Sequence, residues 1–156
     1  MTATVPSEES LVLRQTEAGV ATLTLNRPKH YNALSQAMLA ALQTELDRAA
    51  TDKSVRVVVI AGSGPAFCAG HDLKEMRSHT DPAFHKALFD QCGRVMLTIN
   101  RLPQPVIARV HGIATAAGCQ LVAACDLAIA SADTRMGRLE LRVRDRERKM
   151  LHKIDE

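Results

Sequence analysis

The stretch VRVVVIAGSGPAFCAG, residues 55–70, decides the fold more than any other part of the chain. Its first seven residues form a nearly continuous β-branched run, which is typical of a strand buried on both faces of a parallel sheet. The glycine-rich part that follows predicts a turn. A second buried-type run, VIARV at residues 106–110, leads into the turn-forming pair His111-Gly112. The chain therefore presents twice a strand, a glycine-containing turn and a helix-forming segment.

The segments on either side of these runs complete an α/β pattern. Alternating apolar and polar residues predict two short strands at residues 11–15 and 20–25, with a turn between them. The other predicted elements are helices over residues 35–50, 82–99 and 114–124, and a last strand over residues 127–130. Ser35 is the predicted N-cap of the first helix. This order of strands and helices predicts an α/β domain with a largely parallel sheet and right-handed crossovers.

Composition and charge exclude several classes of protein. The chain is 46% hydrophobic and 24% charged, an ordinary balance for a globular domain. Aromatic residues make up 3%, with no Trp, which supplies little for nucleic-acid recognition by stacking. The net charge is +3, and residues 136–156 hold seven basic and five acidic residues, which we interpret as a solvated tail. Apolar runs are far shorter than the ~20 residues of a membrane span, so we expect neither nucleic acid nor membrane as a partner.

Cysteines and the amino-terminal composition bear on cofactors and location. The four cysteines form no CxxC pair and no zinc-type spacing with the six histidines, so we expect no metal, no bound cofactor and reduced, buried thiols. Residues 2–10 are polar and acidic, unlike a signal peptide or an Arg-rich transit peptide. The sequence therefore predicts a cytoplasmic protein.

The two glycine-containing turns are the first candidates for a site. Backbone N–H groups at such turns and at helix starts are natural donors to anions and oxyanions. Gly70 and Gly118 permit close approach of the backbone to a ligand. The alternative interpretation is that these glycines serve only to form the turns.

Three ordered motifs resemble the enoyl-CoA hydratase/isomerase (crotonase) superfamily. LNRPKHYNALS at residues 25–35 is similar to LNRPxxxNALS, PAFCAGHDLKEM at residues 65–76 to AFxAGxDLxEM, and HGIATAAGCQLVAACD at residues 111–126 to NGxAxGGGxELxxxCD. The resemblance covers about residues 10–135. It implies the ClpP/crotonase ββα spiral, of which residues 1–135 would be the N-terminal half, followed by a charged, non-family tail at residues 136–156.

The resemblance also implies a site. The family's oxyanion hole consists of two backbone N–H groups, which fall here at His71 and Ala117. They would hold the thioester carbonyl of an acyl-CoA substrate and stabilise its enolate, one such donor being worth ~3 kcal/mol. Ala117 replaces a family glycine but keeps the backbone donor. The other positions implied to contact the substrate are Lys29, His30, Ala33, Ala69, Gly70, Asp72, Leu73, Gly112 and Gly118.

The sequence departs from the hydratases at their acid/base residues. Gln120 stands where they have the first catalytic Glu, and an amide cannot act as a general base. Nothing after Arg135 matches the segment of the second Glu. Two hypotheses therefore stay open: an acyl-CoA-processing protein of fatty-acid metabolism, or an inactive, truncated homologue that binds CoA weakly or only packs against a partner. The missing half also builds the family trimer, which argues against that assembly.

For the other reactive side chains near the motifs, we favour a structural role over a catalytic one. We expect Asp72 and Asp126 to cap helices or turns. The resemblance uses only the backbone of His71, although its imidazole could also reach a substrate. Cys68 and Cys119 lack a paired base and are interpreted as inert, small hydrophobic residues.

Overall fold

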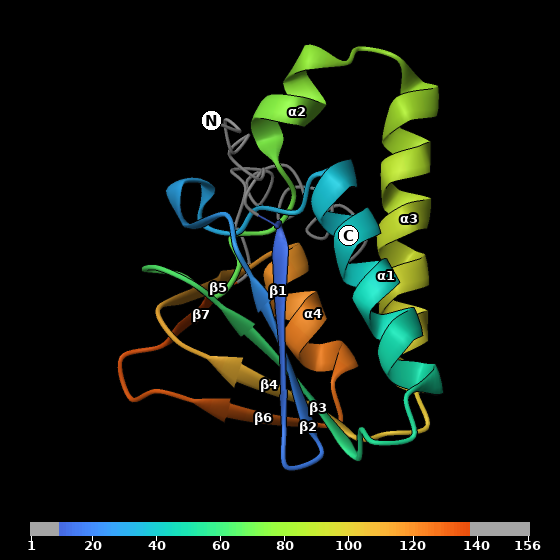
Figure 1. Cartoon of the computed structure of the whole chain (residues 1–156). Coiled ribbons are helices and arrows are strands. Elements are labelled where there is room, and N and C mark those ends of the chain that lie inside the picture. The colour runs from blue at the N-terminus through green and yellow to red at the C-terminus, as the bar shows by residue number, and fades with distance from the viewer. Residues whose placement is uncertain (1–9, 138–156) are drawn as a thin grey trace, which may run out of the picture.

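A five-stranded sheet forms one layer of the molecule in the computed structural model, which describes residues 10–137. Its strand order is β1-β2-β3-β4-β6. The strands are β1 (Val12–Glu17), β2 (Val20–Leu25), β3 (Val57–Gly62), β4 (Val106–Val110) and β6 (Leu127–Ala130). Only β1 runs antiparallel to its neighbour, and the other pairs are parallel. The prediction of an α/β domain with a largely parallel sheet is confirmed (Figure 1).

The antiparallel pair is closed by a two-residue turn. Glu17 pairs with Val20, and the residues between them, Ala18 and Gly19, have φ angles of 49° and 82°. A type I′ hairpin turn requires positive φ at both central residues, because only then does its twist match the flanking strands. The turn expected at residues 17–19 is therefore present.

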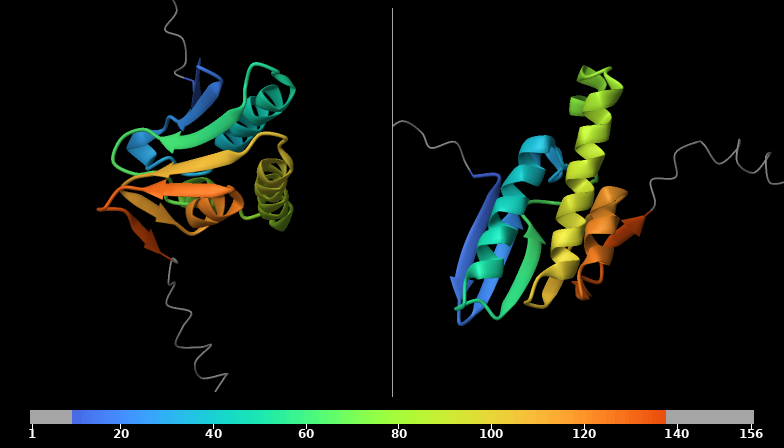
Figure 2. Two further views of the ribbon diagram at one scale, coloured as in Figure 1. Left: turned by 90° about the horizontal axis from the view of Figure 1, so that it is seen from below. Right: turned by 90° about the vertical axis from the view of Figure 1, so that its right-hand side faces the viewer.

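Three longer helices lie side by side against the sheet, as Figure 2 shows in its right-hand view. They are α1 (Gln36–Thr51), α3 (Pro82–Arg101) and α4 (Ala117–Ala124). The predicted cap of α1 is confirmed, since the Ser35 side chain accepts a hydrogen bond from Met38 N at 3.1 Å. A 3-10 turn η1 (Pro28–His30) and a short helix α2 (Leu73–Ser78) complete the helical elements of the described part. Among the described helices, none is both long and apolar enough to cross a bilayer.

The core lies between the sheet and the apolar faces of α1 and α3. Both faces follow the helical spacing seen in the sequence. The buried residues are Met38, Leu39, Leu42 and Leu46 on α1 and Leu88, Cys92, Val95 and Ile99 on α3. Leu23, Leu25, Val58 and Ile60 meet them from the sheet.

The second glycine-containing turn differs from the prediction. The helix expected over residues 114–124 begins only at Ala117, because residues 113–115 form strand β5 (Ile113–Thr115). This strand pairs with β7 (Arg135–Gly137) and also bonds to Cys68. Tertiary hydrogen bonding thus overrides the helical preference of the alanines. Strand β7 also includes two residues after Arg135, and the rest of the tail, 138–156, lies outside the described residues.

Apolar surface is exposed on α3 and on the edge strand β6. Phe89 and Leu97 on α3 are about half exposed, whereas the apolar face of α1 is buried. The edge strand β6 is more open, with Leu127 62% and Ile129 64% exposed. These side chains are exposed because no described residue covers β6.

Candidate functional site

The backbone around His71 is held in place by the segment that precedes α1. Leu34 N donates to the Gly70 carbonyl at 2.8 Å, and Asp72 N donates to the Leu34 carbonyl at 3.2 Å. These two bonds flank His71 in a parallel bridge. Backbone groups of successive residues in an extended segment point to opposite sides. The N–H of His71 therefore points away from Leu34.

The turn before α4 occupies the opposite side of this segment. Cys68 N donates to the Ile113 carbonyl and Thr115 N to the Cys68 carbonyl, both at 3.1 Å. A methyl group placed on Gly70 would lie 3.3 Å from Ala117 N. Gly70 also has a φ of 94°, which residues with side chains rarely adopt. Glycine at this position lets the two turns meet.

Two N–H groups are left without partners where the turns meet. Neither His71 N nor Ala117 N donates a hydrogen bond to another group of residues 10–137. Ala117 is the first residue of α4, and the first N–H groups of a helix have no intrahelical acceptor. The positive end of the helix dipole adds to the field at this point. Such a pair of donors is chemically able to hold a carbonyl oxygen that gains negative charge.

The residue before Ala117 is strained. Ala116 has φ 49° and ψ −123°, a region in which glycine is favoured and a Cβ is disfavoured. Its N–H is held by the Gly137 carbonyl at 3.3 Å. This backbone conformation turns the chain sharply from β5 into α4 and places Ala117 N at the turn.

Replacing Ala116 with glycine is expected to raise the free energy of unfolding by about 1 kcal/mol, because relief of 1–3 kcal/mol of strain exceeds the added entropy of the unfolded chain. Urea denaturation would show a higher midpoint with an unchanged slope. Ala123→Gly on the exposed side of α4 is the matched control, and it should lose about 1 kcal/mol. If both variants lost stability equally, strain at Ala116 would be ruled out.

Contacts with the protein's own backbone explain why two of the predicted site residues, Gly112 and Gly118, are glycines. A Cβ on Gly112 would lie 2.1 Å from the Pro65 carbonyl oxygen, and one on Gly118 would lie 2.1 Å from that of Cys68. Both distances are far below van der Waals contact. For these two residues, internal packing alone requires glycine.

The positions implied to contact substrate are spread around the first turn. Lys29 and His30 lie exposed in η1, Ala33 is 8% exposed, and Leu73 at the start of α2 is 52% exposed. Ala69 is partly buried, beside Gly70. A hollow of about 470 Å³ brings His30 together with Asp72; Arg27, Ser35, Lys74 and Glu75 also line it.

Asp72 has the structural role expected of it. Its carboxylate caps α2 by accepting hydrogen bonds from Lys74 N and Glu75 N, each at 3.1 Å, and it pairs with Arg27 at 3.0 Å. Burial by itself would raise the pKa of Asp72, but the hydrogen bonds and the Arg27 charge outweigh it and lower the pKa. Asp126 likewise accepts a hydrogen bond from Val106 N at 2.7 Å.

The remaining candidates supply no base or nucleophile. The Gln120 side chain is exposed on α4. Burial raises the pKa of Cys68 to about 12, so its thiol stays protonated. Cys119 is partly buried. Residues 10–137 contain no cluster of three or more His, Cys, Asp or Glu side chains able to hold a metal ion.

A buried amide that the sequence reading did not single out ties the first turn together. Asn32 is fully buried, and its Nδ2 donates to the carbonyls of Ser63 and Ala66 at 2.9 and 2.8 Å. Its Oδ1 accepts from Arg27 N at 2.8 Å. Asn32 also has φ 54°, which asparagine tolerates better than most residues. The sequence signal for this role was the position of Asn32, four residues after Pro28 in a predicted loop.

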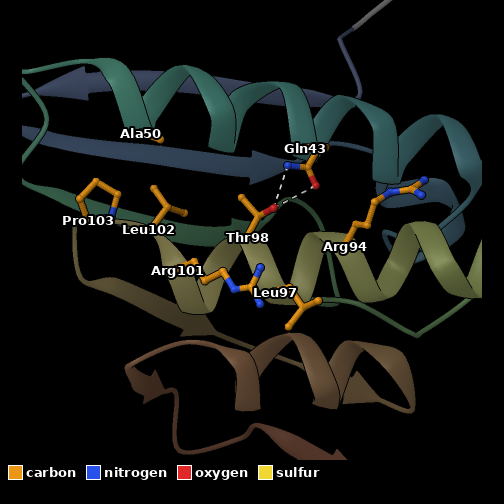
Figure 3. A pocket seen from close by; sticks show the side chains of 8 residues that line it. All are labelled: Gln43, Ala50, Arg94, Leu97, Thr98, Arg101, Leu102 and Pro103. Atoms are coloured by element: carbon orange, nitrogen blue, oxygen red, sulfur yellow. Dashed lines mark hydrogen bonds between the residues drawn. The ribbon is translucent and has the colours of Figure 1, made fainter.

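A second hollow, about 510 Å³ in volume, lies between α1 and α3 (Figure 3). Gln43 and Thr98 bridge it with hydrogen bonds of 2.9 and 3.4 Å. Arg94 and Arg101 line it together with Leu97, Leu102 and Pro103. None of the predicted site residues lies there, and its lining offers no acid/base pair.

Fold and motifs together define a crotonase-type half-spiral, and comparison with known proteins agrees. The sequence model of the enoyl-CoA hydratase/isomerase family matches residues 15–143. The chain belongs to this family, which supports a function related to acyl-CoA. The resemblance drawn from the three motifs is thereby confirmed.

Individual relatives show how much of the fold is present. The enoyl-CoA hydratase domain-containing protein 3 of Rattus norvegicus is 42% identical over 80% of this chain and 42% of its own length. A solved enoyl-CoA hydratase of Mycobacterium smegmatis is 62% identical, with a TM-score of 0.80 over 83% of this chain and 51% of that one. The human domain-containing protein 3 is 41% identical, with a TM-score of 0.79. The chain thus spans about half the length of the relatives it matches.

The predicted cytoplasmic location is wrong. Curated relatives from rat, frog, mouse, human and zebrafish bear names that place them in mitochondria. The prediction rested on the composition of residues 2–10 and on the cysteine pattern. Signals for location are separate from the folded core that these relatives share. The composition of residues 2–10 was therefore a poor guide to location.

Proposed function

We propose that the chain binds the thioester group of an acyl-CoA between the backbone N–H groups of His71 and Ala117, as an acyl-CoA-processing protein of fatty-acid metabolism. The observation that carries this proposal is the meeting, at adjacent turns, of two donors that have no partner within residues 10–137, one of them at a helix N-terminus. Family membership supports the same ligand class.

The chemistry of the site follows from where charge develops. Removal of a proton next to a thioester carbonyl places negative charge on the carbonyl oxygen, and donors already aimed at that oxygen stabilise it without reorganisation. Each donor contributes about 3 kcal/mol to the transition state. Ala117 is only 4% exposed, and the lower dielectric constant of a buried site strengthens the interaction of its N–H with a charged oxygen.

Hydration by two carboxylates is not part of the proposal. The position of the first family Glu carries Gln120, an exposed amide that cannot accept the proton of water. This observation favours a second candidate function, an acyl-CoA-binding homologue without turnover. The two candidates share the binding site and differ only in the chemistry that follows binding.

A comparison of two ligands tests the binding site. Octanoyl-CoA should raise the melting temperature of the chain, since a ligand that binds only the native state stabilises it. S-octyl-CoA, a thioether that lacks the carbonyl oxygen, should bind at least about tenfold more weakly, the equivalent of 1.4 kcal/mol. Equal affinity for the two ligands, or no shift with octanoyl-CoA, would refute the proposal.

A further inference from the structure

The imidazole of His71 is not used by the backbone site described above. Its Nδ1 atom is buried and has no hydrogen-bond partner within residues 10–137. The residue as a whole is only partly buried, and Nε2 is not among the enclosed unpaired atoms. The accessible edge of the ring is therefore the one that carries Nε2. The same residue offers its backbone N–H to the carbonyl oxygen in the proposed site.

An aromatic wall from α3 lies against this ring. The His71 and Phe89 ring centroids are 5.2 Å apart at an interplanar angle of 80°, an edge-to-face contact. Phe89 is itself 50% exposed, so an apolar surface continues outward from the imidazole. Such a wall would suit the acyl chain of a bound thioester.

The surroundings keep the imidazole uncharged. Desolvation lowers the pKa of His71 below its ordinary value of 6.5. It outweighs the opposing effects of the nearby Leu34 carbonyl, which makes no hydrogen bond to Nδ1, and of the Glu75 carboxylate. Glu75 belongs to α2, and the aromatic contact from α3 comes from the uncharged Phe89. At pH 7 the ring is neutral and has a free lone pair. A neutral imidazole is the form that accepts a proton.

We propose that the His71 imidazole is a catalytic base that removes a proton from the α-carbon of the bound acyl thioester, an inference that rests on the proposed function. The ring nitrogen takes the proton, and the electrons of the C–H bond form the C=C bond of the enolate. The resulting oxyanion lies on the N–H groups of His71 and Ala117. Return of the proton from the imidazolium regenerates the thioester, so the step needs no further reactant.

Two arguments support His71 as the base: the expected proximity of its ring to the α-carbon, and the lack of another available base among the described residues at this turn. The α-carbon is bonded to the same carbonyl carbon whose oxygen the His71 N–H would hold, so the ring of that residue lies close to it. Gln120 cannot accept a proton, and the Cys68 thiol is buried. Asp72 is engaged in its cap and ion pair, and Glu75 accepts a hydrogen bond from Gln36 N at 3.0 Å. Among the described residues at this turn, His71 alone combines an open nitrogen with a free lone pair.

Hydrogen–deuterium exchange at the α-carbon tests the inference. Octanoyl-CoA is incubated with the chain in D₂O, and deuterium uptake is followed by mass spectrometry. His71→Gln should exchange at least about 100-fold more slowly, the usual contribution of a general base. Its affinity for octanoyl-CoA should stay within about twofold, because glutamine keeps the backbone donor. The exchange rate of the unmodified chain should rise with pH, with the midpoint of the rise below 6.5, since burial lowers the pKa of His71.

Control variants separate the possible failures. His79→Gln removes an exposed imidazole that stacks on Phe84, and it should leave exchange unchanged. His71→Ala, checked by its melting curve, repeats the test with a different side chain. Binding without exchange, or exchange that survives both His71 substitutions, would overturn the inference but leave the proposed function intact. Absence of octanoyl-CoA binding would overturn both.

Discussion

Gly118→Ala is expected to lower the free energy of unfolding by about 3 kcal/mol, the upper end of the usual cost of overpacking. The new Cβ would lie 2.1 Å from the Cys68 carbonyl oxygen and 2.8 Å from its carbonyl carbon. These are backbone atoms, and the same carbonyl accepts the hydrogen bond of Thr115 N. Relief of the clash must therefore break the bond that joins the two turns.

Gly93→Ala is the matched control for Gly118→Ala. Gly93 lies on the exposed side of α3, and a Cβ there would meet no atom within 4 Å. This variant should gain about 1 kcal/mol, because alanine is a better helix former than glycine. Urea denaturation would measure both variants. A Gly118→Ala chain as stable as the parent would contradict the close packing of the two turns.

Asn32→Ala is expected to lower the free energy of unfolding by about 4 kcal/mol. It would leave the Arg27 N–H and the carbonyls of Ser63 and Ala66 without their present partner. An unsatisfied buried polar group costs about 1–3 kcal/mol. A loss of this size is a large part of the roughly 5–15 kcal/mol that stabilises a typical domain.

Asn100→Ala provides the comparison for Asn32. Asn100 is exposed and donates one hydrogen bond, to the Ala124 carbonyl at 2.6 Å. Its replacement should cost less than about 1 kcal/mol, since water replaces the lost partner. Thermal denaturation followed by circular dichroism would rank the two variants. Equal effects would show that burial of Asn32 contributes little.

The elements themselves were largely predictable from the sequence. The β-branched run before Gly62 and the helical spacing from Met38 to Leu46 led to the correct element types, because burial on two faces and burial on one stripe leave different patterns. Ser35 and Pro82 marked helix starts correctly, since capping is local chemistry. Resemblance of three motifs then identified the family, which the comparisons confirm.

The start of α4 was not predictable in the same way. Composition predicted that the helix starts at Ala114. The backbone groups of residues 113–115 instead bond to Cys68 and to β7, both distant in sequence. The cytoplasmic location was also wrong, because it rested on the composition of residues 2–10 and on the cysteine pattern. Both errors came from using local composition to predict features that residues elsewhere in the chain determine.

By itself, the sequence determined the class of the sheet, the faces of the helices and the presence of an amide that cannot act as a base at Gln120, since each of these depends on side-chain type and spacing. Only the tertiary structure decided how closely the turns of Gly70 and Ala117 pack, that Asn32 holds the first turn through Ser63 and Ala66, and that the His71 ring packs edge-to-face against Phe89. The physical reason is that hydrogen bonds and steric contacts between residues far apart in the chain set these positions. Such contacts leave no periodic signal in the sequence.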